Sequence, residues 1–200
     1  MPQTFWDERF SEEGFVYGTE PNAFLVEQAG CLAPAARVLV PGDGEGRNGV
    51  WLAGRGFNVL SVDASAVGIG KAKRLAAERG VDIATEVADL ATWKWPVAAF
   101  DGVVAVFLHL PPAIRPIVHH CIVAALKPGG IVILEAFRPE QLVYGTGGPK
   151  DPAMLYEPRQ LMSDFAGTEP LLLEETLIDL DEGKFHSGRA ATVRLVARKR

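Results

Sequence analysis

Residues 37–55 read RVLVPGDGEGRNGVWLAGR. A short apolar run, residues 37–40, leads into glycines at alternate positions, and an amphipathic stretch follows at residues 49–55. Glycine adopts backbone dihedrals that other residues avoid, and Gly56 stands where a helix commonly ends. The spacing therefore predicts a strand, a tight turn and a helix.

The same alternation of strand and helix continues along the chain. Ser65 can cap a helix that stops at Gly80, and Pro111 and Pro112 fit the first turn of a helix that runs to about Leu126. Five such alternations predict an α/β fold with a doubly wound, mostly parallel sheet and right-handed crossovers. The expected strands are the apolar runs 37–40, 58–62, 82–87, 102–107 and 131–134.

The two ends of the chain depart from this alternation. Residues 171–180 and 190–197 are consecutive strand-like runs around a turn at 181–183, which predicts an antiparallel hairpin at one edge of the sheet. Residues 22–28 predict an extra capped helix before the first strand, and Pro158 can open a further helix after the glycine-rich loop.

Composition excludes several classes of protein. The chain has 200 residues, of which 48% are hydrophobic and 22% charged, and this suits one globular domain. A net charge of −5 argues against nucleic acid as a partner. The N-terminus has no targeting signal and no apolar run reaches a membrane-spanning length, so we expect a cytoplasmic protein without a membrane partner. Cys31 and Cys121 are too few for a disulfide framework, and we expect both to be buried in a reducing compartment.

The candidate ligand site lies where the predicted parallel strands end. In a doubly wound sheet, ligands bind beyond the carboxyl ends of the strands, where the strand order reverses. Gly42, Gly44 and Gly46 follow the first strand and let a ligand approach the backbone. Asp63 ends the second strand about 20 residues later, where a carboxylate can accept ribose hydroxyls, and Asp89 ends the third.

The charge of the glycine loop separates two cofactor classes. The glycine spacing also fits dinucleotide binding, but a pyrophosphate needs a positive environment that Asp43 and Glu45 would oppose. S-adenosylmethionine (SAM) carries no phosphate and has a cationic sulfonium and an ammonium group, so an acidic loop suits it better. The alternative is that each acid simply faces solvent from a tight turn.

Further motifs carry a family resemblance over nearly the whole chain. The sequence resembles class I SAM-dependent methyltransferases and, more narrowly, the small bacterial tellurite-resistance methyltransferases of the TehB type. The matching segments are WDERF (6–10), YGTEPN (17–22), GDGEGRN (42–48), HLP (109–111), LKPGG (126–130) and YGTGGP (144–149).

This resemblance implies a seven-stranded sheet with helices on both faces and a reversed C-terminal hairpin. It also implies one methyltransferase domain over residues 1–200, with a lid at 1–30, a SAM-binding core at 37–137 and an acceptor side at 138–200. Val40 stands where the family often has an acid that binds the SAM amine, and Asp43 and Glu45 are the candidates for that role. The predicted cofactor residues are Arg9, Tyr17, Gly42, Asp43, Gly44, Gly46, Asp63, Ala64, Asp89, Leu90 and Phe107.

The acceptor side offers two histidines. His109 follows the fourth strand and could remove a proton from an acceptor or hold an oxyanion, although it could equally be a structural histidine at a helix start. His186 lies near the terminal turn, where the tellurite-resistance relatives place an acceptor histidine; the alternative is an exposed turn residue. Arg115 and Arg189 are the candidate substrate cations. No metal site is expected, because zinc needs three or four converging ligands.

Aromatic residues near the N-terminus predict a lid. Phe5, Trp6, Phe10, Phe15 and Tyr17 are too apolar for a disordered tail, and we expect them to cover the cofactor mouth and exclude water. The alternative is a helix that only covers sheet surface.

These features together predict SAM-dependent methyl transfer, by in-line displacement, to a small soluble acceptor such as a thiol or a chalcogen oxyanion. Two alternatives stay open: a non-catalytic SAM-binding regulatory module and an NAD-dependent oxidoreductase. We expect a monomer or a homodimer.

Overall fold

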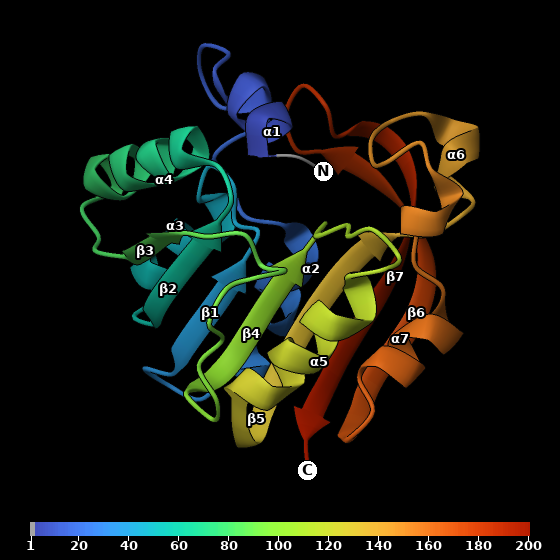
Figure 1. Cartoon of the computed structure of the whole chain (residues 1–200). Coiled ribbons are helices and arrows are strands. Elements are labelled where there is room, and N and C mark those ends of the chain that lie inside the picture. Colours follow the sequence, from blue (N-terminus) through green and yellow to red (C-terminus); the bar gives the residue numbers. More distant parts are fainter. Residues whose placement is uncertain (1–2) are drawn as a thin grey trace.

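The computed structural model describes residues 3–200 and shows one seven-stranded sheet with helices on both faces (Figure 1). The strand order is β3-β2-β1-β4-β5-β7-β6. The prediction of a doubly wound, mostly parallel sheet is confirmed, because β1 to β5 all pair in parallel. The strands are β1 (Arg37–Pro41), β2 (Asn58–Asp63), β3 (Ala84–Val87), β4 (Phe100–Val106), β5 (Leu126–Phe137), β6 (Thr168–Asp181) and β7 (Ser187–Lys199).

Two sets of helices cover the sheet. Helices α2, α3 and α4 pack on one face, and α5 and α7 pack on the other. Helix α1 lies above the carboxyl ends of the strands (Figure 1). The helices are α1 (Gln3–Phe10), α2 (Ala23–Gln28), α3 (Arg47–Gly54), α4 (Ala66–Arg79), α5 (Arg115–Ala125), α6 (Gln141–Tyr144) and α7 (Pro158–Asp164), with short 3-10 turns at Ala29–Cys31 and Pro152–Met154.

The central strands are apolar because both of their faces are buried. In β1, Leu39 contributes to the core beneath α5 and α7, whereas Val38 and Val40 contribute to the core beneath α2 and α3. Side chains alternate between the faces of a strand, so a strand covered twice must be apolar throughout. From β1 the chain adds β2 and β3 on one side of the sheet and then β4 and β5 on the other side. The carboxyl end of β1 is therefore the point where the strand order reverses.

The terminal hairpin is confirmed. Strand β7 pairs antiparallel with β5, as in Leu134 opposite Leu195, and β6 pairs antiparallel with β7 at the outer edge. Glu182 and His186 close the turn, where the Glu182 amide donates to the His186 carbonyl oxygen at 2.8 Å. The hairpin thereby brings the chain back to the carboxyl ends of the parallel strands.

Local capping explains several helix boundaries. The Ser65 hydroxyl accepts the Gly68 amide at the start of α4, and Gly80 ends that helix in the left-handed conformation, as expected. Helix α5 starts at Arg115, later than the predicted Pro111, because residues 111–114 form a separate turn. No helix in the described part of the chain is long and apolar enough to cross a membrane.

The expectation that both cysteines are buried is wrong. Cys31 is exposed in the 3-10 turn that follows α2, and Cys121 is half-buried on α5. Helix α5 directs Val118 and Ile122 into the core. Position 121 is rotated by about 100° from its neighbour, so its side chain lies at the border of the buried face.

Candidate functional site

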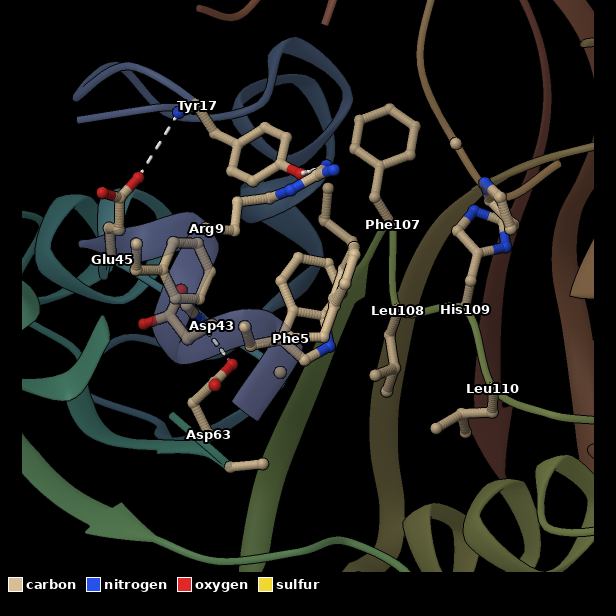
Figure 2. Close-up of a pocket in the computed structure, with 18 of the residues that line it drawn as sticks. Phe5, Arg9, Tyr17, Asp43, Glu45, Asp63, Phe107, Leu108, His109 and Leu110 are labelled. Atoms are coloured by element: carbon tan, nitrogen blue, oxygen red, sulfur yellow. Dashed lines mark hydrogen bonds between the residues drawn. The ribbon is translucent and has the colours of Figure 1, made fainter. Parts of the chain in front are cut away.

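A cavity of about 450 Å³ opens at the switch point of the sheet. Its wall combines the glycine loop after β1, the ends of β2 and β4, helix α1 and the turn of the terminal hairpin. Figure 2 shows carboxylates at one end, near Asp63, and rings at the other, near Phe107 and His109. The predicted residues that line the cavity are Arg9, Tyr17, Gly42, Asp43, Gly44, Asp63, Ala64, Asp89, Leu90, Phe107, His109 and His186.

The glycine loop depends on conformations and approaches that only glycine allows. Gly42, Gly44 and Gly46 have φ values of 68°, 59° and 88°. A Cβ on Gly46 would lie 2.5 Å from the Cβ of Ala72 on α4, so this glycine also permits close packing behind the loop. A Cβ on Gly42 would lie 2.8 Å from Cδ1 of Leu108, across the cavity wall.

Asp43 braces the loop from within. Its carboxylate accepts hydrogen bonds from Ser61 Oγ at 2.7 Å and from the Gly49 amide at 3.2 Å. Burial raises the pKa of Asp43 to about 6, although these hydrogen bonds act in the opposite direction. Its main partners thus join the loop to β2 and α3.

Glu45 connects the loop to the N-terminal segment. Its carboxylate accepts the Val16 amide at 2.8 Å and pairs with Lys71 Nζ, also at 2.8 Å. The expectation of an acid that faces solvent does not fit this residue, which is 4% exposed. Glu45 is therefore neutralised by α4, and the loop is less negative than its sequence suggests.

Asp63 lies at the base of the cavity. Its two carboxylate oxygens accept the Gly44 and Ser65 amides, each at 2.8 Å. Burial raises its pKa, and the backbone hydrogen bonds oppose that shift. Each carboxylate oxygen can accept more than one hydrogen bond, so Asp63 orders the loop and still has acceptor capacity for ligand hydroxyls.

The β3 side of the cavity is more apolar. Leu90 is buried and Ala64 half-buried, while Asp89 is exposed at the rim, where its carboxylate accepts the Ala91 amide. The Trp95 indole donates to the Leu90 carbonyl oxygen at 3.0 Å. This tryptophan braces the loop and is not part of the cavity lining.

Helix α1 contributes aromatic side chains to the cavity wall, and its role as a lid stays a prediction. Phe5, Trp6 and Phe10 line the cavity. Asp7 accepts a hydrogen bond from Ser65 Oγ at 2.6 Å and thereby fixes α1 to the start of α4. Phe10 packs directly on the glycine loop, because a Cβ on Gly44 would lie 3.0 Å from its ring.

Arg9 and Tyr17 extend this wall toward the hairpin. Arg9 donates to the Tyr17 hydroxyl at 3.0 Å (Figure 2), and its guanidinium lies 4.4 Å from the centroid of the Phe185 ring. Phe15 lies outside the cavity lining, against Lys71 and Arg74 of α4.

Aromatic rings form the opposite wall. Phe107 follows β4 with a φ of 51° and stacks on Phe137 with 4.5 Å between ring centroids. A bulky side chain at positive φ is strained, and such strain is concentrated at functional sites. The centroid of the His186 ring lies 4.7 Å from that of Phe107 and 4.6 Å from that of Tyr17.

The two predicted catalytic histidines differ in their hydrogen bonds. His109 Nδ1 lies 2.8 Å from the Met154 carbonyl oxygen, and its Nε2 accepts the Phe137 amide at 3.2 Å. Burial lowers the pKa of His109 to about 4, so the ring is neutral. Both ring nitrogens are thus used by backbone groups, which suits the structural alternative for His109.

His186 is held differently. Its Nδ1 lies 3.7 Å from Glu182 Oε2 and has no hydrogen-bond partner among the described residues. Burial lowers its pKa, while Glu182 partly offsets that shift. The same carboxylate accepts Arg47 Nη2 at 2.8 Å. These contacts leave His186 as the histidine of the wall with unused hydrogen-bonding capacity.

The two predicted substrate cations lie away from the cavity. Arg115 pairs with Asp164 at 2.8 Å, beneath the acceptor wall. Arg189 projects from β7 and lies 3.4 Å from Asp179 on the neighbouring strand. Their sequence positions are close to His109 and His186, but their strand and helix geometry directs them elsewhere.

Among the residues that sequence reasoning missed, three bear on the chemistry of the site. Arg47 and Phe137 line the cavity, and Glu182 links Arg47 to the hairpin turn. Arg47 stands in the quoted glycine motif, so its position was visible although its role was not. Phe137 and Glu182 carry no local signal in the sequence. The pairing of β7 with β5 and with β6 sets where strand β5 ends and where the hairpin turn lies.

Comparisons with known proteins agree with this geometry. A family model described as "Methyltransferase domain" matches residues 38–130, which span β1 to the start of β5. Residues 38–130 are therefore similar to methyltransferase domains. A curated relative, thiopurine S-methyltransferase of Xanthobacter autotrophicus, is 40% identical to this chain over 86 residues. The match covers 40% of this chain and 38% of that relative.

Solved structures share the fold over almost the whole chain. One, from a study of the conversion of a disulfide bond into a thioacetal group in echinomycin biosynthesis, has a TM-score of 0.79 at 22% identity and covers 98% of this chain and 92% of its own. TehB from Haemophilus influenzae has a TM-score of 0.72 at 18% identity and covers 99% of this chain and 67% of its own. These likenesses show that the methyltransferase fold includes the terminal hairpin.

The family and the fold imply SAM as the cofactor, and the cavity fits it. Asp63 offers a carboxylate for ribose hydroxyls, and Leu90 and Ala64 offer an apolar surface for a base. The absence of side chains at Gly42 and Gly44 leaves the backbone open to a ligand. These are the residues that would hold the nucleoside part.

Proposed function

We propose that this protein transfers the methyl group of SAM to a small acceptor, a thiol or a chalcogen oxyanion of the tellurite or selenite type. One observation carries the proposal: a single cavity joins Asp63 and the glycine loop to an aromatic wall that holds His186. A donor bound at the first end would have its reactive group beside an acceptor at the second.

The first end would bind and orient the donor. Asp63 is held by the Gly44 and Ser65 amides, so its carboxylate is positioned before any ligand arrives. When bound, SAM supplies an electrophilic methyl group on a sulfonium, which is transferred in a direct displacement. Orientation alone can contribute about 7 to 11 kcal/mol to such a reaction.

The second end would exclude water and handle the acceptor proton. Phe107 and Phe137 form a stacked apolar surface, and aromatic residues of α1 also line the cavity. Aromatic faces attract a cation such as a sulfonium. His186 is neutral because burial lowers its pKa; with a proton on Nδ1, toward Glu182, its Nε2 lone pair would accept a proton from a neutral thiol. An anionic acceptor needs no such base.

Two observations support an acceptor whose nucleophilic atom is sulfur, selenium or tellurium. The wall around His186 is aromatic, which suits a polarisable sulfur, selenium or tellurium atom better than a strongly hydrated one. The curated relative is named for S-methylation of thiopurines. Both observations favour a chalcogen nucleophile.

Isothermal titration with SAM and with NAD tests the cofactor. We expect micromolar SAM affinity, equivalent to about −8 kcal/mol, and 10- to 100-fold weaker binding for Asp63→Asn, since the loss of a charged hydrogen bond costs about 1.5–3 kcal/mol. Asp82→Asn, an exposed aspartate before β3, serves as the control. Binding of NAD and not SAM would support the oxidoreductase instead.

Release of S-adenosylhomocysteine tests the reaction. Thiols, selenite and tellurite are supplied separately to the SAM-saturated protein, and turnover is expected with at least one. His186→Gln should reduce turnover of a neutral thiol about 100-fold or more, as loss of a positioned base does. Tight SAM binding without turnover of any acceptor would favour the non-catalytic regulatory module.

A further inference from the structure

Arg47 has an unused hydrogen-bond donor inside the cavity wall. It is the first residue of α3, its side chain is 8% exposed, and it lines the cavity. One terminal nitrogen, Nη2, donates to Glu182 at 2.8 Å, whereas Nη1 is buried without a partner among the described residues. A buried guanidinium N–H rarely lacks an acceptor, so this atom points to a ligand group.

The start of α3 adds a second feature that favours an anion. Gly46 precedes the helix with a φ of 88° and has no side chain to cap it, while the Asp43 carboxylate accepts the amide of Gly49 in the first turn. The amino end of a helix carries a partial positive charge and free amides, and it commonly binds carboxylate or phosphate. Arg47 and this helix end lie on the same side of the cavity because they belong to the same turn.

The neighbouring carboxylates already have partners. Glu45 pairs with Lys71, and Asp43 accepts Ser61 Oγ and the Gly49 amide. Glu182 is divided between Arg47 and Asn22, whose amide donates to Oε1 at 3.0 Å. The acceptor for Arg47 Nη1 must therefore come from outside the described chain.

We propose that Arg47 binds the α-carboxylate of the methionine portion of SAM through Nη1, and that Glu182 positions its guanidinium. The inference rests on the proposed use of SAM. Arg47 directly follows the glycine loop, at the cofactor end of the cavity, so its partner belongs to the donor and not to the acceptor. A charged, bidentate-capable donor suits a carboxylate. The contact would make the terminal hairpin, through Glu182, a part of cofactor recognition.

Wild-type protein provides the first test. Isothermal titration compares SAM with decarboxylated SAM, which lacks only the carboxylate, and with 5′-deoxy-5′-methylthioadenosine, which lacks the amino-acid portion. We expect decarboxylated SAM to bind 10- to 100-fold more weakly than SAM. Equal affinities would overturn the inference. If neither SAM nor methylthioadenosine binds, the proposed function fails and this inference fails with it.

A paired substitution locates the contact. Arg47→Gln combined with Glu182→Gln removes both charges of the buried pair together and avoids a lone buried carboxylate. The double variant should lose 10- to 100-fold in SAM affinity, keep methylthioadenosine affinity within about twofold, and no longer distinguish SAM from decarboxylated SAM. Arg55→Gln, at the exposed other end of α3, is the matched control.

Two results would contradict the assignment. Equal loss of SAM and methylthioadenosine affinity would show a structural role for Arg47. Unchanged SAM affinity with a raised KM for an anionic acceptor would assign Nη1 to the acceptor. Should the double variant fail to fold, the wild-type comparison of SAM with decarboxylated SAM still decides whether the carboxylate is recognised.

Discussion

At the β1–β2 end of the cavity, the carboxylates of Asp43, Glu45 and Asp63 are buried, and each accepts hydrogen bonds from the protein itself. At the β4–β5 end, the wall consists mainly of stacked rings, among them Phe107 and Phe137. The first end is stabilised by directed polar contacts and the second by close packing.

This difference teaches how each end responds to change. A carboxylate that orders a loop couples binding to loop geometry, so a small backbone change at Gly46 affects the ligand. An aromatic wall excludes water and tolerates several acceptors of similar shape, because packing is less directional than hydrogen bonding. We therefore expect cofactor affinity to be sensitive to single atoms and acceptor choice to be broader.

The largest expected effect is the loss of stability and of SAM affinity when the glycine loop at the polar end is disrupted. Gly46→Ala would place a Cβ 2.5 Å from the Cβ of Ala72 on a residue with a φ of 88°. Strain and overpacking together should cost about 2–5 kcal/mol and weaken SAM binding, measured by urea unfolding and titration. Gly56→Ala is the control, since Gly56 has a similar φ but open space, and about 1–2 kcal/mol is expected. Equal costs would show that loop packing is unimportant.

The next largest effect is a difference in folding stability between substitutions of the two histidines at the aromatic end. His109→Ala leaves the Phe137 amide and the Met154 carbonyl group without a partner, which should cost about 2–4 kcal/mol. His186→Ala should destabilise the fold less, because its Nδ1 has no hydrogen bond among the described residues. Denaturant unfolding of both variants measures the difference. A larger loss for His186→Ala would contradict this division.

The pH dependence of stability should have opposite sign for Asp43 and for Glu182. The pKa of Asp43 is raised from 3.8 to about 6, so the folded state retains this proton and the contribution of Asp43 to stability falls as pH rises from 4 to 6. The pKa of Glu182, beside Arg47 and His186, is lowered from 4.5 to about 2, so its contribution is present above pH 4.5 and is lost toward pH 2.

Asp43→Asn and Glu182→Gln test these signs. Each contribution is at most about 3 kcal/mol. Urea unfolding between pH 3 and 7 should show that Asp43→Asn gains stability relative to wild type as pH rises, while Glu182→Gln loses it. The same slope for both variants would show that the two carboxyl groups share one environment.

The smallest expected effect concerns the sequence candidate Arg189. Its pair with Asp179 is exposed and 3.4 Å long, so Arg189→Ala should change stability by less than about 0.5 kcal/mol. Because the side chain lies outside the cavity lining, acceptor KM should stay within about twofold. A tenfold rise in KM with an anionic acceptor would restore Arg189 as a substrate residue and shift the boundary of the aromatic end.

The sequence by itself determined the sheet and the polar end of the site. Strand runs, glycines and caps act within a few residues of each other, so they predict β1, the loop and Asp63 directly. The packing of the N-terminal aromatic residues could also be foreseen, because apolar side chains in a polar segment must be covered.

Tertiary structure alone decided the other end. Tyr17, Phe107, Phe137 and His186 come from distant segments, and the pairing of β5 with β7 sets where the last two lie. It also decided that both nitrogens of His109 are engaged, and that Arg47 lines the cavity while its buried Nη1 has no partner among the described residues. Hydrogen-bond partners depend on distance in space, whereas a sequence records only distance along the chain.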